Sequence, residues 1–303
     1  MSGPAPDADA SRHLSEVFAD AGCAGWVHAR TIGRAVEREF DWAADDPVVM
    51  ASVYKLPLLL ALCDLAEIGQ IDLTATVVVD PADWAVGPTG IATLHDPVTL
   101  SWRDLAVQMM VISDNAAADV ILDRVGLPRV QEKLDALGLT ETRVVGGMAE
   151  LQQQLVRETG TDTVVEAFSV LADADRTMTV TAYDPALASA TTPRDGTRLL
   201  QLIWTDRAVS AQMSEFVRST MRKQAWQQRL SSGFPLGVAT IAGKTGTLGA
   251  IRNEIAVVEY PGEHPIAVAV FTLAARAELS LPTVEAAVGR AARIAVTAVR
   301  SPL

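Results

Sequence analysis

The pattern of apolar and polar residues changes twice along the chain. Residues 25–32, 35–42 and 48–52 form the short runs that are typical of strands. A glycine and polar residues separate the first two runs, which predicts a hairpin. Strand patterns return near the other end of the chain, at residues 238–247, 253–260 and 266–274. The sequence therefore predicts strands at both ends.

Helical spacing dominates the residues between these two groups of strands. Apolar side chains recur there every three or four positions, as they do on the buried face of a helix. The helices predicted there are residues 53–69, 101–112, 115–125, 128–137, 147–158, 162–173, 193–205 and 208–223. Two more are predicted outside the strands, residues 9–22 before them and 281–299 after them.

This order of elements predicts an α/β (α+β) fold with an antiparallel sheet that is assembled from both chain ends and flanked by helices. We expect residues 1–51 and 226–303 to form one discontinuous α/β domain, and residues 52–225 to form an inserted all-helical domain. Because a cleft between two such parts is a common place for a site, we expect the active site there.

The composition argues against some partners and compartments. The 303 residues carry a formal net charge of −12, which disfavours nucleic acid, because phosphate backbones are bound by basic surfaces. No apolar run approaches the roughly 20 residues needed to span a bilayer. Residues 1–18 lack the basic and then apolar layout of a secretory signal. We therefore expect a cytoplasmic protein without a membrane span.

The cysteines and histidines predict no metal centre and no cofactor. Cys23 and Cys63 are far apart in sequence, and two free thiols are favoured over a disulfide. The four histidines show no spacing that is typical of metal ligands.

The stretch SVYK, residues 52–55, is the first candidate for chemistry. Pro57 is tolerated only in the first turn of a helix, so the helix should begin near residue 53. Ser52 then lies at the helix N-terminus, and Lys55, three residues later, shares its face and can reach its hydroxyl. The alternative is a capping serine beside a surface lysine. The chain has only four lysines, which favours a chemical use of Lys55.

Two tripeptides add to this pair. Residues 113–115, Ser-Asp-Asn, follow an apolar helical stretch and could be an ordinary helix start. Residues 244–246, Lys-Thr-Gly, lie in a strand pattern, where the glycine indicates either a close approach by another backbone or an edge bulge.

Together, and in this order, the three motifs resemble the signature of class A β-lactamases and penicillin-binding proteins. The resemblance covers nearly the whole chain, including Thr-Thr-Pro at 191–193 and the strand pair around Lys244, and is weakest over 140–190. It implies a β-lactamase/transpeptidase-like fold and a serine hydrolase that forms an acyl-enzyme.

The resemblance also implies a role for each matching residue. Ser52 would be the nucleophile and Lys55 its base, and Ser113 would relay a proton to the leaving group. Asp114 would hold its loop through backbone N–H groups. The remaining positions would bind substrate. The Asn115 side chain would hydrogen-bond an amide of the substrate, and Gly246 would leave room for the substrate along the strand. The backbone N–H groups of Ser52 and Thr247 would form the oxyanion hole, and a substrate carboxylate would bind to Lys244, Thr245 and Arg252.

The sequence departs from the family where class A enzymes keep the glutamate that positions the deacylating water. Residues 176–193 contain no glutamate, and Asp184 is their only carboxylate. Glu150, Glu158 and Glu166 precede that segment, but their spacing singles out none of them.

Three functions remain open on these grounds. The chain could be a hydrolase of an amide, ester or β-lactam carbonyl. It could be a cytosolic esterase or transacylase of secondary metabolism, or a covalent acyl-binding receptor with little turnover. In each case the expected partner is a small molecule that carries a carboxylate, and the oligomeric state stays open.

Overall fold

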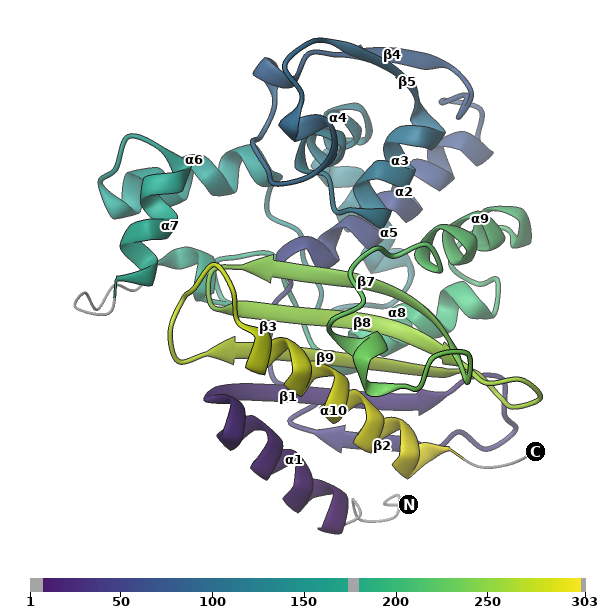
Figure 1. Ribbon diagram of the computed structural model, residues 1–303. Coiled ribbons are helices and arrows are strands. Elements are labelled where there is room, and N and C mark those ends of the chain that lie inside the picture. Colours follow the sequence, from purple (N-terminus) through teal and green to yellow (C-terminus); the bar gives the residue numbers. More distant parts are fainter. Residues whose placement is uncertain (1–7, 174–179, 301–303) are drawn as a thin grey trace.

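The protein is described here from a computed structural model, and its described residues are 8–173 and 180–300. A five-stranded antiparallel sheet lies at its centre, in the order β2-β1-β9-β8-β7 (Figure 1). The strands are β1 (Cys23–Thr31), β2 (Glu39–Trp42), β7 (Thr240–Leu248), β8 (Ile251–Glu259) and β9 (Ile266–Ala274). The predicted sheet from both chain ends is confirmed, including the β1–β2 hairpin.

Helices cover both faces of this sheet. On one face lie α1 (Ala8–Ala21) and α10 (Pro282–Val299), which also contact each other. On the other lies α8 (Pro193–Trp204), which packs on β9, β1 and β8. Alternate side chains of β8 and β9 enter the two apolar clusters, as the two-residue period of a strand requires.

The helical layer is organised around α2 (Lys55–Glu67), which a 3-10 turn, η1 (Ala51–Tyr54), precedes. The leucines of α2 are buried on every side, which is typical of a helix at the centre of a core. Its neighbours are α3 (Trp102–Val111), α4 (Asn115–Val125), α5 (Leu127–Ala136) and α9 (Ala211–Met221). A second group, α6 (Met148–Thr159) and α7 (Val164–Ala172), packs together at one side of this layer (Figure 1).

Several features differ from the sequence prediction. The stretch expected to be purely helical also contains the ladder of β4 (Thr76–Val79) with β5 (Val98–Ser101). The strand expected over 48–52 is only β3 (Val48–Val49), because the chain turns at Met50 into η1; β3 pairs with β6 (Ala190–Thr191). The short 3-10 turns are η2 (Pro81–Asp83), η3 (Gly90–Thr93), η4 (Thr181–Tyr183) and η5 (Leu230–Gly233).

Two expectations about composition can be compared with the structure. Cys23 and Cys63 are both free thiols, the first half-buried and the second buried. None of the helices within residues 8–173 and 180–300 combines the length and the apolar character that a bilayer crossing requires.

Candidate active site

Ser52 lies in the η1 turn, between the end of β3 and the start of α2. Its neighbour Ala51 has a φ of 46°, a left-handed conformation that costs a non-glycine residue about 1–3 kcal/mol. The side-chain amide of Asn253 on β8 donates to the carbonyls of Val49 (2.8 Å) and Met50 (3.4 Å). The sheet therefore holds this strained turn in place, with Ser52 only 7% exposed.

The Lys55 side chain is fully buried and points toward the loop that precedes α4. Its ammonium nitrogen donates to the Ser113 carbonyl (2.7 Å), the Asn115 side-chain oxygen (2.9 Å) and the Asp114 carbonyl (3.2 Å). Burial lowers the Lys55 pKa to about 7, against the opposing charges of Asp114 and Asp119. An amine with a pKa in this range can both release and take up a proton near neutral pH.

The Lys55 contacts differ from the predicted direct contact with Ser52. Among the described residues, no hydrogen bond joins the Lys55 amine to the Ser52 hydroxyl. Four oxygens of the 113–115 loop surround the amine instead, and Ser113 Oγ is one of them, at 3.4 Å.

The 113–115 loop is itself held tightly. Ser113 has a φ of 61°, a second strained residue at the site. The Asp114 carboxylate accepts from the backbone N–H of Ile91 (2.6 Å) and of Ala117 (3.3 Å), so its predicted structural role is confirmed. Asn115 donates to the Val86 carbonyl (3.0 Å), which leaves its oxygen directed at Lys55.

Lys244 on β7 brings a second amine to the same hydroxyl. Its nitrogen lies 3.0 Å from Ser113 Oγ and 2.8 Å from the Thr245 carbonyl. Burial, and then the positive charges of Lys55 and Arg229, hold the Lys244 pKa well below its usual range. Two buried amines that share one hydroxyl disfavour a state in which both are charged, so the group is suited to moving a proton.

Gly246 allows β7 to approach the nucleophile turn. A Cβ atom there would lie 2.6 Å from the Met50 carbonyl oxygen. Of the two predictions for this glycine, the close backbone approach is the one observed. The neighbouring Thr245 is buried, whereas Thr247, whose backbone N–H the family resemblance assigned to the oxyanion hole, is exposed.

The predicted carboxylate ligand Arg252 is not directed at this group. Its guanidinium donates to four backbone carbonyls, those of residues 249, 251, 278 and 279, and is buried. A different arginine, Arg229, donates to the Gly246 carbonyl (2.9 Å) and to Thr247 Oγ1 (2.6 Å). Arg229 could not be predicted from the sequence, because it lies in an irregular segment outside every motif.

The carboxylates in and before residues 176–193 accept hydrogen bonds from nearby backbone N–H groups. Asp184 accepts from Ala186 N–H (2.8 Å) in its own turn, and Glu166 closes the capping box of α7. Glu158 accepts from Thr181 N–H (3.0 Å). Residues 176–179 of that segment lie outside the described residues.

The N-terminus of α6 is held against α4, the helix that begins at Asn115. Asp119 on α4 accepts from the N–H groups of Met148 and Ala149, at 2.8 and 2.9 Å. Gln152 donates to the Val86 carbonyl (2.7 Å), the same oxygen that Asn115 contacts. In the part of the chain that the structure describes, no carboxylate is hydrogen bonded to Lys55 or Ser52.

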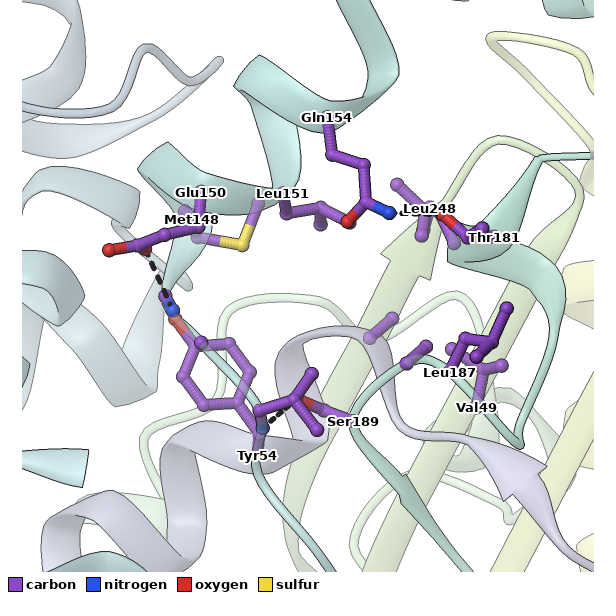
Figure 2. Close-up of a pocket in the computed structure, with 16 residues that line it drawn as sticks. Val49, Tyr54, Met148, Glu150, Leu151, Gln154, Thr181, Leu187, Ser189 and Leu248 are labelled. Carbon is purple, nitrogen blue, oxygen red and sulfur yellow. Dashed lines mark hydrogen bonds between the residues drawn. The ribbon is translucent and has the colours of Figure 1, made fainter. Parts of the chain in front are cut away.

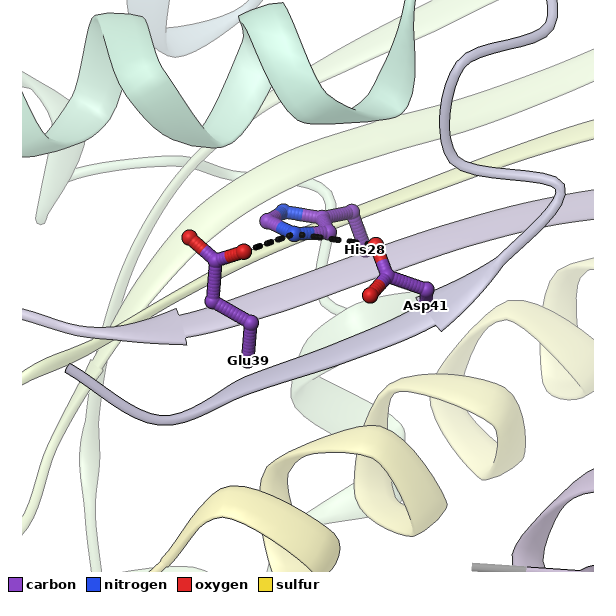
Figure 3. Close-up of side chains that lie close together, drawn as sticks. All are labelled: His28, Glu39 and Asp41. Atoms are coloured by element: carbon purple, nitrogen blue, oxygen red, sulfur yellow. Dashed lines mark ion pairs between the residues drawn. The ribbon is translucent and has the colours of Figure 1, made fainter. Parts of the chain in front are cut away.

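A second polar cluster lies on β1 and β2, away from these motifs. His28 Nε2 lies 3.7 Å from Glu39 and 3.5 Å from Asp41, and Figure 3 shows both carboxylates turned toward the ring. Ligand atoms at such spacing could hold a metal. However, the Arg194 guanidinium donates to all three side chains, so we interpret the cluster as an ion-pair network.

The five-stranded sheet and its helical layer form a β-lactamase/transpeptidase-like fold. This fold brings Ser113 beside two buried lysines, Lys55 and Lys244. The chain belongs to the β-lactamase enzyme family, whose model matches residues 9–299.

Two named relatives support this membership. The chain is 27% identical over 297 residues to the β-lactamase regulatory protein BlaB of Streptomyces cacaoi, covering 93% of this chain and 95% of that protein. It is 25% identical over 263 residues to the extended-spectrum β-lactamase PER-1 of Pseudomonas aeruginosa, covering 80% of this chain and 74% of PER-1.

Solved structures show the same fold at lower identity. A β-lactamase from Sphaerobacter thermophilus superposes with a TM-score of 0.77 at 23% identity, over 97% of this chain and 98% of its own. PBP-A superposes with a TM-score of 0.75 at 18% identity, over 98% of both chains.

Proposed function

We propose that the protein is a serine acyl-enzyme hydrolase of the β-lactamase type, with Ser52 as nucleophile and Lys55 as base. The observation that carries this proposal is the meeting of Lys55 and Lys244 at the Ser113 hydroxyl, since Lys55 directly follows the turn that bears Ser52. A base with a pKa near the working pH is the efficient one, and the Lys55 pKa of about 7 meets that condition.

The reaction begins when Ser52 Oγ attacks the carbonyl carbon of a β-lactam, amide or ester. The hydroxyl proton passes to Lys55, either after a small side-chain movement or through a water molecule, because no hydrogen bond joins these two described side chains. The bond from carbon to the leaving nitrogen or oxygen then breaks. Ser113, between Lys55 and Lys244, returns the proton to the leaving atom.

The oxyanion hole would consist of the backbone N–H groups of Ser52 and Thr247. Preorganised donors of this kind act best when they cannot relax, and Asn253, Gly246 and Arg229 fix the two segments concerned. A typical donor contributes about 3–4 kcal/mol to transition-state stabilisation.

A substrate carboxylate would bind at the end of β7. Lys244 and Thr245 remain the predicted contacts there. The arginine that contacts this end of β7 is Arg229 and not Arg252, and its charge is shared with Glu285.

The test is a time course of intact mass after mixing the protein with benzylpenicillin. Acylation adds the whole mass of the penicillin to the protein, and Ser52→Ala should abolish the adduct. Lys55→Arg keeps a positive charge but removes the titratable base, and should slow the adduct strongly. No adduct and no hydrolysis with β-lactams, a thioester or an activated ester would refute the proposal.

A second candidate is a covalent acyl receptor that turns over slowly. It is favoured by the lack of any carboxylate hydrogen bonded to Ser52 or Lys55 among the described residues, since rapid deacylation needs a positioned base. BlaB, the relative with 27% identity, bears the name of a regulatory protein. The same time course separates the two functions: an adduct that persists indicates a receptor, and one that disappears with release of product indicates a hydrolase.

A further inference from the structure

A pocket of about 90 Å³ lies beside the nucleophile turn, between η1 and the first turns of α6 (Figure 2). Ala51 and Tyr54, which bracket Ser52, both line it. Leu248, which follows Thr247 on β7, also belongs to its wall. At about 10–15 Å³ for each water-sized probe, the pocket has room for a small ligand group. None of the roles proposed above uses this space.

Tyr54 lines this pocket, and its hydroxyl is a buried, unpaired polar group. The side chain is only 3% exposed, and its oxygen has no hydrogen-bond partner. Leaving a buried hydroxyl unpaired costs about 1–3 kcal/mol. Burial, and then the charges of Asp119 and Glu150, raise the Tyr54 pKa well above its usual range, so the hydroxyl keeps its proton and can donate.

Glu150 adds an acceptor to the same end of the pocket. One of its carboxylate oxygens accepts from the Gly147 N–H (3.0 Å), which leaves further acceptor capacity on the group. In Figure 2, Glu150 and Tyr54 lie on one side of the pocket and Val49 and Leu187 on the other. No lysine or arginine is among its lining residues in the part of the chain that the structure describes.

These two groups select the charge of a ligand. A carboxylate could accept from Tyr54, but Glu150 would repel it, and no cation is present to offset that repulsion. An ammonium group could pair with Glu150, but it cannot accept the Tyr54 proton. An amide satisfies both, because its acceptor and its donor are on different atoms.

We propose that this pocket binds an uncharged amide that carries an apolar group. The Tyr54 hydroxyl donates to the amide carbonyl, and the Glu150 carboxylate accepts from the amide N–H. The apolar group packs against Val49, Leu187 and Leu248. Such an amide has two possible sources: the side chain of the acyl donor itself, or a separate small molecule.

The binding test compares two probes of nearly equal shape, phenylacetamide and phenylacetate, by isothermal titration calorimetry. Phenylacetamide should bind, and phenylacetate should bind at least tenfold more weakly. Tyr54→Phe should weaken phenylacetamide binding about 2- to 10-fold, the effect of one hydrogen bond. Tyr260→Phe, the same change at a distant buried tyrosine, should leave it unchanged.

Glu150→Gln keeps the test decisive if Tyr54→Phe does not fold. Removal of the negative charge should raise the affinity for phenylacetate several-fold. The proposal is overturned if phenylacetamide does not bind, if phenylacetate binds equally well, or if both variants bind both probes as the wild type does.

The source of the amide is assigned by kinetics, and only this step rests on the proposed function. Benzylpenicillin carries a phenylacetamido group, and 6-aminopenicillanic acid lacks it. Phenylacetamide should slow acylation by the first compound alone if the pocket holds the side chain of the acyl donor. An equal effect on both, or none, assigns the pocket to a separate molecule. If neither compound acylates the protein, the proposed function fails, while the calorimetry still decides whether the pocket binds amides.

Discussion

The contact of β7 with the nucleophile turn can be tested at a single position, Gly246. In Gly246→Ala, the new Cβ would lie 2.6 Å from the Met50 carbonyl oxygen and 3.2 Å from Val53 Cγ2. Relaxed carbon–oxygen contacts begin at about 3.3 Å, so strand and turn must separate by about 0.7 Å. The obstacle is backbone, held by Asn253, and cannot rotate away.

Two effects should follow from this displacement. Overpacking of this kind costs about 1–3 kcal/mol of unfolding free energy. A shift approaching 1 Å between the oxyanion-hole strand and Ser52 should slow acylation by about 10- to 100-fold. Urea unfolding measures the first effect, and the rate of benzylpenicillin adduct formation measures the second.

The matched control is Gly196→Ala on α8. Its Cβ would meet Ala269 and Ile255 at 3.5 Å, an ordinary contact. Alanine is favoured over glycine inside a helix by about 0.5–1 kcal/mol, so this variant should be neutral or more stable and should acylate normally. If Gly246→Ala matched this control in both measurements, the close packing of β7 on the turn would not govern the site.

Four further outcomes are expected. The acylation rate should rise with pH through about 7, because the unprotonated Lys55 amine is the base. Lys55→Arg should lose this inflection, and a flat pH profile in the wild type would contradict the role of Lys55. The Lys55 pKa in the folded protein lies below its ordinary value of 10.5, so the unfolded state binds more protons between pH 7 and pH 10.5. This group should therefore increase the free energy of unfolding from pH 7 toward pH 10.5, as measured by urea unfolding at several pH values. Arg229→Met should cost about 3–5 kcal/mol by urea unfolding, because it leaves Glu254 and Glu285 without their buried cation, whereas the exposed Arg12→Met should have little effect. Asp114→Ala should cost about 1 kcal/mol or more by urea unfolding through the lost helix cap. Because it also removes a charge that raises the Lys55 pKa, it should move the rise of the acylation rate toward lower pH.

The sequence alone determined the elements and the motifs. Strand and helix periods are local properties, so the sheet from both chain ends and most helix positions could be predicted without knowing any long-range contact. The three motifs could be found because each is contiguous. The short β4–β5 ladder was missed, since four-residue strands have too few positions to show a period.

The tertiary structure decided what surrounds those motifs. Lys244 and Ser113 meet although 131 positions separate them, and only the packing of β7 on the helical layer brings them together. That packing also removes water from Lys55, and desolvation by residues from several elements cannot be predicted from a tripeptide. The same reasoning applies to the two arginines. Arg252 matched the family's carboxylate-binding arginine by position, yet in the fold its guanidinium donates to backbone carbonyls, and Arg229 is the arginine that contacts β7.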